Sequence, residues 1–240
     1  MPATTLAGEC YVAMFSSCSK LKKAPALPAT TMTYSCYKLM FNGTGIKTAP
    51  ALPATTLADN CYESMFSGCK SLTAAPALPA TTLANNCYYN MFNSCSSLTT
   101  TSALPATTLY TNCYNSMFSY CKNLENAPAL PATTMITNCY SSMFKECSSL
   151  TSSPTLAATT LAENCYDSMF SGCKSLTTAP ALPATTLTKK CYYNMFNGCS
   201  SLTSAPALPA TAINDSAYYG MFKGCSSLVN SPTLELSSIS

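Results

Sequence analysis

The sequence repeats a unit of 26 residues along almost its whole length. The segment Tyr-x-x-Met-Phe occurs nine times, with its tyrosines at 11, 37, 62, 88, 114, 140, 166, 192 and 218. Successive tyrosines are 26 residues apart except at one step of 25. A fixed period of this size is typical of a solenoid, in which each unit packs only on its neighbours. We therefore expect equivalent side chains of successive units to lie over one another, without a unique cleft.

The charged residues narrow the range of functions. They make up 9% of the chain, the formal net charge is +3, and the twelve basic residues are all lysines. Without arginine the usual bidentate contacts to phosphate and guanine are missing, so we expect no nucleic-acid partner. No apolar run approaches the ~18 residues that span a bilayer, so we expect no membrane insertion. Repeat residues follow Met1 at once, so we expect no secretory signal in this sequence.

The unit from Leu83 to Leu109 illustrates the pattern within one repeat. Four apolar side chains follow the i, i+3, i+4, i+7 spacing of one helix face. They are Tyr88, Met91, Phe92 and Cys95. Asn86 precedes them, as an N-cap would. Several units carry a glycine that suits a left-handed helix stop, at Gly43, Gly68, Gly172, Gly198 and Gly224. The spacing predicts one helix of about two turns in each unit.

The residues after this segment predict a strand. Ser97-Leu98-Thr99 is a short apolar element, and its leucine recurs in every unit except one, where it is Ile46. The A-P-A-L-P stretch that follows carries prolines, such as Pro76 and Pro79, which cannot donate ladder hydrogen bonds. We expect the strand at the leucine and a second short strand at the Thr-Thr-Leu segment. The expected core of a unit comprises Cys87, Tyr88, Met91, Phe92, Cys95 and Leu98.

The extent of the repeat predicts one elongated domain. We expect a single solenoid of nine units over 1–230, followed by a C-terminal cap or tail at 231–240. Met1 stands where other units carry leucine, such as Leu27 and Leu52. We therefore expect the solenoid to be truncated at its N-terminal end, and a gene product that starts within a repeat is the alternative.

The segment M-F-K-G-C-S-S-L at Met221–Leu228 resembles a known family. It is similar to the leucine-rich repeats of BspA-type surface proteins, and closer still to a surface-lipoprotein repeat with M-F-x-G-C-S-S-L-T. The resemblance implies an α/β solenoid of leucine-rich-repeat type, with one short parallel strand and one short helix per unit. It also implies an extracellular or cell-surface location and adhesion to a protein or glycan on another cell or matrix. The A-P-A-L-P stretch departs from the family pattern, which leaves the regularity of the sheet open.

Sixteen cysteines form two columns, one beside the recurring tyrosine and one eight residues later. In a continuous helix Cys87 and Cys95 would lie about 12 Å apart, beyond the ~7 Å between Cα atoms that a disulfide bridges. We expect buried free thiols that act as small core residues. Disulfides between neighbouring units remain an alternative. A metal site has little support, because the chain has no histidine and no Cys-x-x-Cys spacing, and we expect no cofactor.

No unit contains a distinctive catalytic cluster. The nine acidic residues are scattered, and no thiol has a histidine to activate it. We therefore expect that the protein is not an enzyme.

A non-catalytic binding or adhesion module is the leading interpretation, because a solenoid offers a broad surface with tunable positions. The residue after the recurring tyrosine varies, and it is itself a tyrosine at Tyr89, Tyr193 and Tyr219. Tyr120 is a further candidate at another position. Exposed tyrosines can anchor proteins or glycans. Neutral drift of surface positions remains the alternative explanation for each of them.

Two other functions remain open. Open solenoid ends expose matching apolar columns, so the protein could be a structural one that associates head to tail into homo-oligomers or fibres. Eight Thr-Thr pairs, such as Thr81-Thr82, could form ranks that bind ice or a crystal surface. Adjacent threonines in an extended chain point to opposite faces, so we expect one exposed rank.

Overall fold

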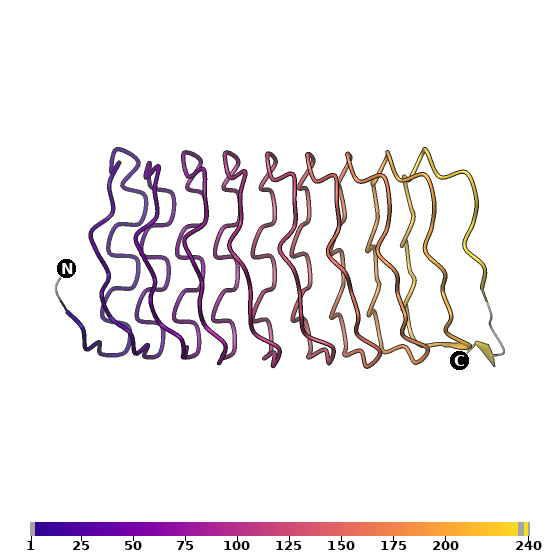
Figure 1. The fold of residues 1–240 in the computed structure, drawn as a ribbon, viewed down its shortest axis with the longest axis horizontal. Helices are drawn as coiled ribbons and strands as arrows, with labels where there is room; N and C mark the ends of the chain where they lie inside the picture. Colours follow the sequence, from indigo (N-terminus) through magenta and orange to yellow (C-terminus); the bar gives the residue numbers. More distant parts are fainter. Residues whose placement is uncertain (1–2, 235–237, 240) are drawn as a thin grey trace.

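The chain winds in successive coils that are stacked along one long axis, with its two ends at opposite ends of that axis (Figure 1). The structure is a computed structural model that describes residues 3–234 and 238–239. One 26-residue repeat makes one coil, because equivalent side chains meet in neighbouring coils. The rings of Phe66 and Phe92, for example, stack with their centroids 5.6 Å apart.

The predicted helix and the predicted strand of each unit are both wrong. The described residues contain no helix, and the segment from Cys87 to Cys95 is a run of turns. Regular strand is limited to β1 (Ala212–Ile213) and β2 (Ser238–Ile239), which pair in parallel. The fold is therefore a coil of linked turns and extended segments, and the α/β description does not apply to it.

The turns close through alternate backbone amides. The amides of Tyr89, Met91 and Asn93 each donate to the carbonyl three residues earlier. The amides between them donate to the next coil, as Tyr88 does to Cys113 at 3.0 Å and Phe92 does to Met117 at 2.9 Å. Every second amide thus lies along the axis and links two coils. This pattern replaces the i→i−4 ladder of a helix.

Left-handed residues at every fourth position explain why no helix forms. In the example unit they are Asn86, Asn90 and Ser94, with φ of 54°, 54° and 61°. A positive φ breaks a right-handed helix, and Asn and Gly adopt it at the lowest cost. The five glycines at which we predicted a left-handed residue do have positive φ, between 66° and 77°. They are the third left-handed residue of each unit, so they continue the run of turns.

The apolar spacing that suggested a helix fits a period of four equally well. Buried residues come in pairs, Cys87 with Tyr88 and Met91 with Phe92, and Cys95 follows. A two-turn helix face and this coil both place residues i, i+3, i+4 and i+7 on one side. The signal that separates them is the column of Asn, Ser and Gly at every fourth position. We interpreted its first member, Asn86, as an N-cap.

Parallel pairing outside β1 and β2 is confined to single bridges. Some lie two residues after the leucine column, as in Ala74 with Thr100, and others lie in the threonine pairs, as in Thr56 with Thr82. Both places are close to those where we predicted strands. The extended chain between them contains the prolines, which lack the amide needed to continue a ladder.

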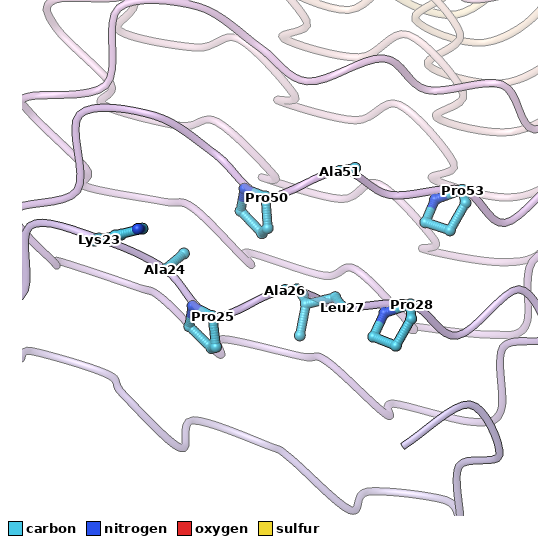
Figure 2. Close-up of a pocket in the computed structure, with 9 residues that line it drawn as sticks. All are labelled: Lys23, Ala24, Pro25, Ala26, Leu27, Pro28, Pro50, Ala51 and Pro53. Carbon is cyan, nitrogen blue, oxygen red and sulfur yellow. The ribbon is translucent and has the colours of Figure 1, made fainter. Parts of the chain in front are cut away.

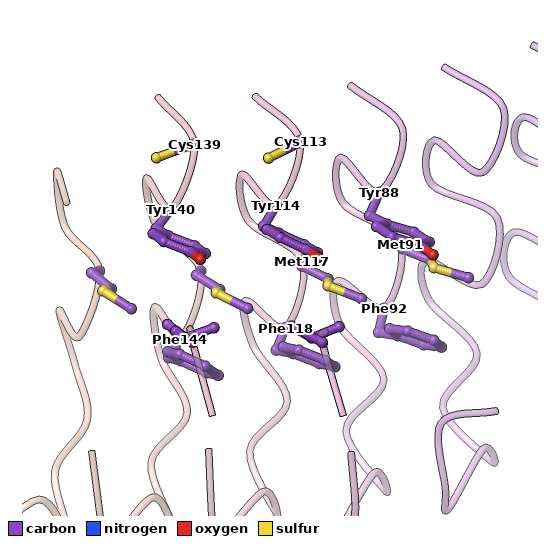
Figure 3. Close-up of a cluster of buried hydrophobic side chains, with 14 of the residues drawn as sticks. Tyr88, Met91, Phe92, Cys113, Tyr114, Met117, Phe118, Cys139, Tyr140 and Phe144 are labelled. Carbon is purple, nitrogen blue, oxygen red and sulfur yellow. The ribbon is translucent and has the colours of Figure 1, made fainter. Parts of the chain in front are cut away.

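The core consists of side-chain ladders that run along the axis. Tyrosines from Tyr11 to Tyr218 form one stack and phenylalanines from Phe15 to Phe222 form another. Figure 3 shows the part of these stacks from Tyr88 to Tyr140 and from Phe92 to Phe144. Neighbouring rings have centroids 5.6–6.1 Å apart and planes within 10° of parallel. This range fits offset stacking. The six side chains named above as the core of one unit are each at most 1% exposed.

The cysteines of the second column form a third ladder. The thiol of Cys95 donates to the carbonyl oxygen of Phe66 in the preceding coil at 3.0 Å, and Cys121 does the same to Phe92 at 3.2 Å. Thr44 occupies the equivalent position in the second unit, and its hydroxyl donates to the carbonyl of Phe41. All sixteen cysteines are free thiols, and only Cys10 and Cys18 are exposed.

The division into a solenoid at 1–230 and a cap or tail at 231–240 stays a prediction. Residues 235–237 and 240 of the expected cap lie outside the described residues. The N-terminal truncation, which we inferred from Met1, also falls outside them, because residues 1–2 are not described. Of the expected cap, β2 lies beside β1 of the ninth unit, with Ala212 opposite Ser238.

Candidate binding surfaces

The variable position after the core tyrosine forms a surface column along the coil. It reads Val12, Lys38, Glu63, Tyr89, Asn115, Ser141, Asp167, Tyr193 and Tyr219. Neighbouring members lie within contact distance, because the Lys38 ammonium lies 3.0 Å from the Glu63 carboxylate. A ligand that covers several coils would therefore contact several of these side chains at once.

Two of the four candidate tyrosines meet in this column. The rings of Tyr193 and Tyr219 stack with centroids 4.9 Å apart and an interplanar angle of 8°. Tyr219 is 62% exposed, which makes it the most exposed aromatic among the described residues. The Lys190 ammonium lies 5.5 Å from the centre of the Tyr193 ring, within the range of a cation–π contact. Sequence analysis missed Lys190, although it is the one lysine in the first left-handed column.

The other two candidates lie apart from this pair. Tyr89 is in the same column, but Glu63 and Asn115 are its neighbours there, and it is half-buried without an aromatic partner. At ~4.8 Å per coil, Tyr89 lies about 19 Å from Tyr193 along the axis. Tyr120 belongs to the third left-handed column and is 40% exposed. The four tyrosines therefore form one pair and two separate positions.

One carboxylate precedes the tyrosine pair in the column. Burial raises the pKa of Asp167, while a hydrogen bond from Ser168 and the charges of Lys190 and Lys145 act in the opposite direction. The hydroxyl of Ser168 donates to the Asp167 carboxylate at 2.6 Å. Lys190 is thus a positive charge shared between an acidic residue and an aromatic ring.

The A-P-A-L-P segments form an apolar face on another side of the coil. In Figure 2 the segments Pro25–Pro28 and Pro50–Pro53 run side by side, with their proline rings in register. A shallow hollow of about 370 Å³ lies between them, and a similar one of about 360 Å³ lies one coil further on. The face repeats from coil to coil, except that Ser102 and Ala157 each replace a proline.

Both threonines of a pair are exposed, whereas we expected one exposed threonine in each pair. Both Thr81 and Thr82 are exposed, and so are both members of the pair Thr185-Thr186. The chain bends at Thr81, so the two side chains of a pair are not on opposite faces of one straight strand. The prediction of a single exposed rank is therefore wrong.

Within the described part of the chain, no group of three or more His, Cys, Asp or Glu side chains is placed to hold a metal ion. The described residues also include no apolar helix of a length that could cross a bilayer. Burial raises the pKa of the core thiols, for example that of Cys113 to about 12. These thiols are protonated at neutral pH, in which form they are poor nucleophiles and metal ligands.

Comparison with known proteins gave one match. A family model described as "BspA type Leucine rich repeat region" matches six copies over residues 61–177 and 156–238. No curated protein and no solved structure matched the chain. The match covers most of the solenoid, including all the units that carry the candidate tyrosines.

Proposed function

Since the chain belongs to the BspA-type leucine-rich repeat family, we propose that it is a non-catalytic module that binds a protein or glycan at a cell surface or in the extracellular space. Family membership supports the surface location and the adhesive role. The stacked pair Tyr193–Tyr219, of which Tyr219 is exposed, supports the proposal that binding occurs there.

The tyrosine pair has the physical properties of a binding anchor. Tyrosine offers a large amphipathic area with few rotatable bonds. Stacking already restricts the two rings in the free protein, so a ligand that contacts them orders little more side-chain freedom. Lys190 beside Tyr193 adds a positive charge that can meet a carboxylate or other anionic group of the partner.

The chemistry of the core supports the proposal of a non-catalytic role. The core thiols are buried, burial raises their pKa values, as at Cys113 and Cys199, and the core side chains repeat from coil to coil. Cys10 and Cys18 are the two exposed thiols. A nucleophile needs an activating base, and the chain has no histidine. The repeated surface instead suits multivalent contact with an extended partner.

A panel of glycans and extracellular-matrix proteins, immobilised and probed with the purified chain, tests the proposal. The double variant Tyr193→Ser/Tyr219→Ser should weaken the strongest interaction at least tenfold. Tyr110→Ser is the matched control, because Tyr110 is exposed but has no stacked partner among the described residues. Equal binding by the double variant and the wild type would show that this pair is not the binding site.

Head-to-tail association is a second candidate, favoured by the direction of the inter-coil hydrogen bonds. In the turn run, the linking amides of each coil donate toward the next coil, from Glu9 to Tyr34 through Gly198 to Lys223. Within the turn run, one coil end therefore presents amide donors and the opposite end presents carbonyl acceptors, whereas the residues after the leucine column link the coils in both directions. Sedimentation over a concentration series tests this, and a strict monomer at high concentration would remove it.

A further inference from the structure

A hollow beside the third left-handed column is lined by lysine, serine and tyrosine side chains. It has a volume of about 310 Å³ and is lined by Lys70, Ser94, Ser96, Tyr120 and Lys122. Lys70, Ser96 and Lys122 are equivalent residues of three successive coils, so the two lysines flank the serine. Their Cα atoms are about 10 Å apart, which is two coil spacings.

Tyr120 occupies a backbone position that disfavours it. Its φ is 61°, and it is the one aromatic residue among the described residues with positive φ. Five of the nine equivalent positions carry glycine, which adopts this conformation freely. A bulky residue held in a left-handed conformation is a known mark of functional sites. Its ring is 40% exposed and lines the hollow, so it does not serve the core.

The charges around the hollow leave the lysines available. Neither Lys70 nor Lys122 forms an ion pair with a described residue, whereas Lys38 and Lys189 do. The next acidic residue in the column, Glu146, leans the other way, because its carboxylate lies where a Cβ on Gly172 would stand. No acidic side chain lines the hollow.

A second site in the same column can be compared with this one. The same Lys-Ser-Lys pattern recurs at Lys122, Ser148 and Lys174. There the serine and tyrosine of the third left-handed column are replaced by Glu146 and Gly172. A carboxylate takes the place of a hydroxyl, and the aromatic ring is missing. Of these two Lys-Ser-Lys sites, only the one at Tyr120 combines two ammonium groups with an aromatic ring.

We propose that the hollow between Lys70 and Lys122 binds one sulfated or carboxylated sugar unit of an acidic polysaccharide. The two ammonium groups receive the anionic group, since lysine acts as a compact point charge with three donors. The serine hydroxyls offer further hydrogen bonds, and the Tyr120 ring packs against the apolar face of the sugar. The volume is at the lower end of ligand sites, which suits a single ring. This site is separate from the Tyr193–Tyr219 pair and does not depend on it.

Fluorescence anisotropy with a labelled heparin hexasaccharide tests the proposal. A desulfated form of the same hexasaccharide retains the carboxylates, and a neutral hexasaccharide carries no charge. Wild-type protein should bind the sulfated probe, the desulfated probe or both, and should not bind the neutral one. Inorganic sulfate at matched ionic strength should compete weakly. Failure to bind either charged probe, equal binding of the neutral one, or full competition by sulfate would each overturn the proposal.

Three variants locate the binding. The double variant Lys70→Gln/Lys122→Gln should weaken binding at least tenfold, and Tyr120→Gly, which restores the commonest residue of the column, should weaken it about threefold or more. Lys174→Gln is the matched control and should remain within twofold of wild type. An equal loss in the control would mean that overall charge alone drives binding. Unchanged binding by Tyr120→Gly would show that the Tyr120 ring does not contact the sugar. Unfolding temperatures of all variants establish that they are folded.

Discussion

The hydroxyl groups of three core tyrosines are buried without a hydrogen-bond partner. They belong to Tyr62, Tyr114 and Tyr140. Burial raises the pKa of Tyr114 well above its usual value, so the group stays neutral. We predict that Tyr114→Phe stabilises the protein, because the substitution removes a polar group that lost its water on folding and gained nothing in return.

The expected change in stability on Tyr114→Phe is the sum of two opposing effects. An unpartnered buried polar group costs about 1–3 kcal/mol. Removal of the oxygen leaves a small void, which lowers the stability by a few tenths of a kcal/mol at ~24 cal/mol per Å³. The net gain should be about 1 kcal/mol or more, which raises the unfolding temperature by roughly 2–4 °C for a chain of this length. Tyr62→Phe should add a similar gain, because Tyr62 is two coils away and independent.

Thermal unfolding followed by calorimetry and urea unfolding followed by tyrosine fluorescence measure this change. Tyr34→Phe is the control, because Tyr34 is 53% exposed and its hydroxyl reaches water. The control should not change stability. If Tyr114→Phe lowers stability by 1 kcal/mol or more, the hydroxyl has a partner in solution and the reasoning about the core ladder is wrong.

Three further predictions concern the backbone and the thiols. Gly198→Ala adds a side chain at φ 76°, so it should lower the free energy of unfolding by about 1–2 kcal/mol. Ser17 occupies the equivalent position and already has a Cβ, so Ser17→Ala should leave the stability nearly unchanged. Equal effects of the two variants on the urea midpoint would contradict this prediction. At pH 8 a thiol-reactive dye should label only Cys10 and Cys18 in the folded protein, and rapid labelling of further thiols would show that the core is open. Burial raises the pKa of Cys113 from 9.0 to about 12, so stability should fall as the pH rises from 9 towards 12. The unfolded chain then releases a proton that the folded protein retains, at up to ~1.4 kcal/mol per pH unit for each such thiol; a urea midpoint that is unchanged between pH 8 and 10.5 would contradict it.

The repeat and the family could be predicted from the sequence because both depend on spacing alone. The 26-residue period is visible in the recurring tyrosine, and its physical consequence is the stack that brings Tyr88 next to Tyr114. The helix could not be predicted correctly from the same residues. Over nine residues a helix face and a four-residue coil place Tyr88 and Met91 on the same side, and only the backbone angles distinguish them.

The binding surfaces were predictable only in part. The variable column identified Tyr193 and Tyr219, but the contact between them and with Lys190 depends on which side chains the coil brings together. Tyr120 was identified only as a candidate binding residue, and its left-handed backbone and its lysine neighbours were not predicted. Those properties depend on the left-handed backbone at every fourth residue, and a predicted helix has no such residues in its interior.

Hydrogen-bond scalar couplings measured by NMR test the central claim most directly, since they report which carbonyl accepts from a given amide. The decisive residue is Phe92, whose amide lies 2.9 Å from the carbonyl oxygen of Met117 in the next coil. A coil of turns predicts a coupling between the Phe92 amide nitrogen and the Met117 carbonyl carbon. A coupling from the Phe92 nitrogen to the Tyr88 carbonyl carbon would mean that the segment is a helix after all, and would contradict the account.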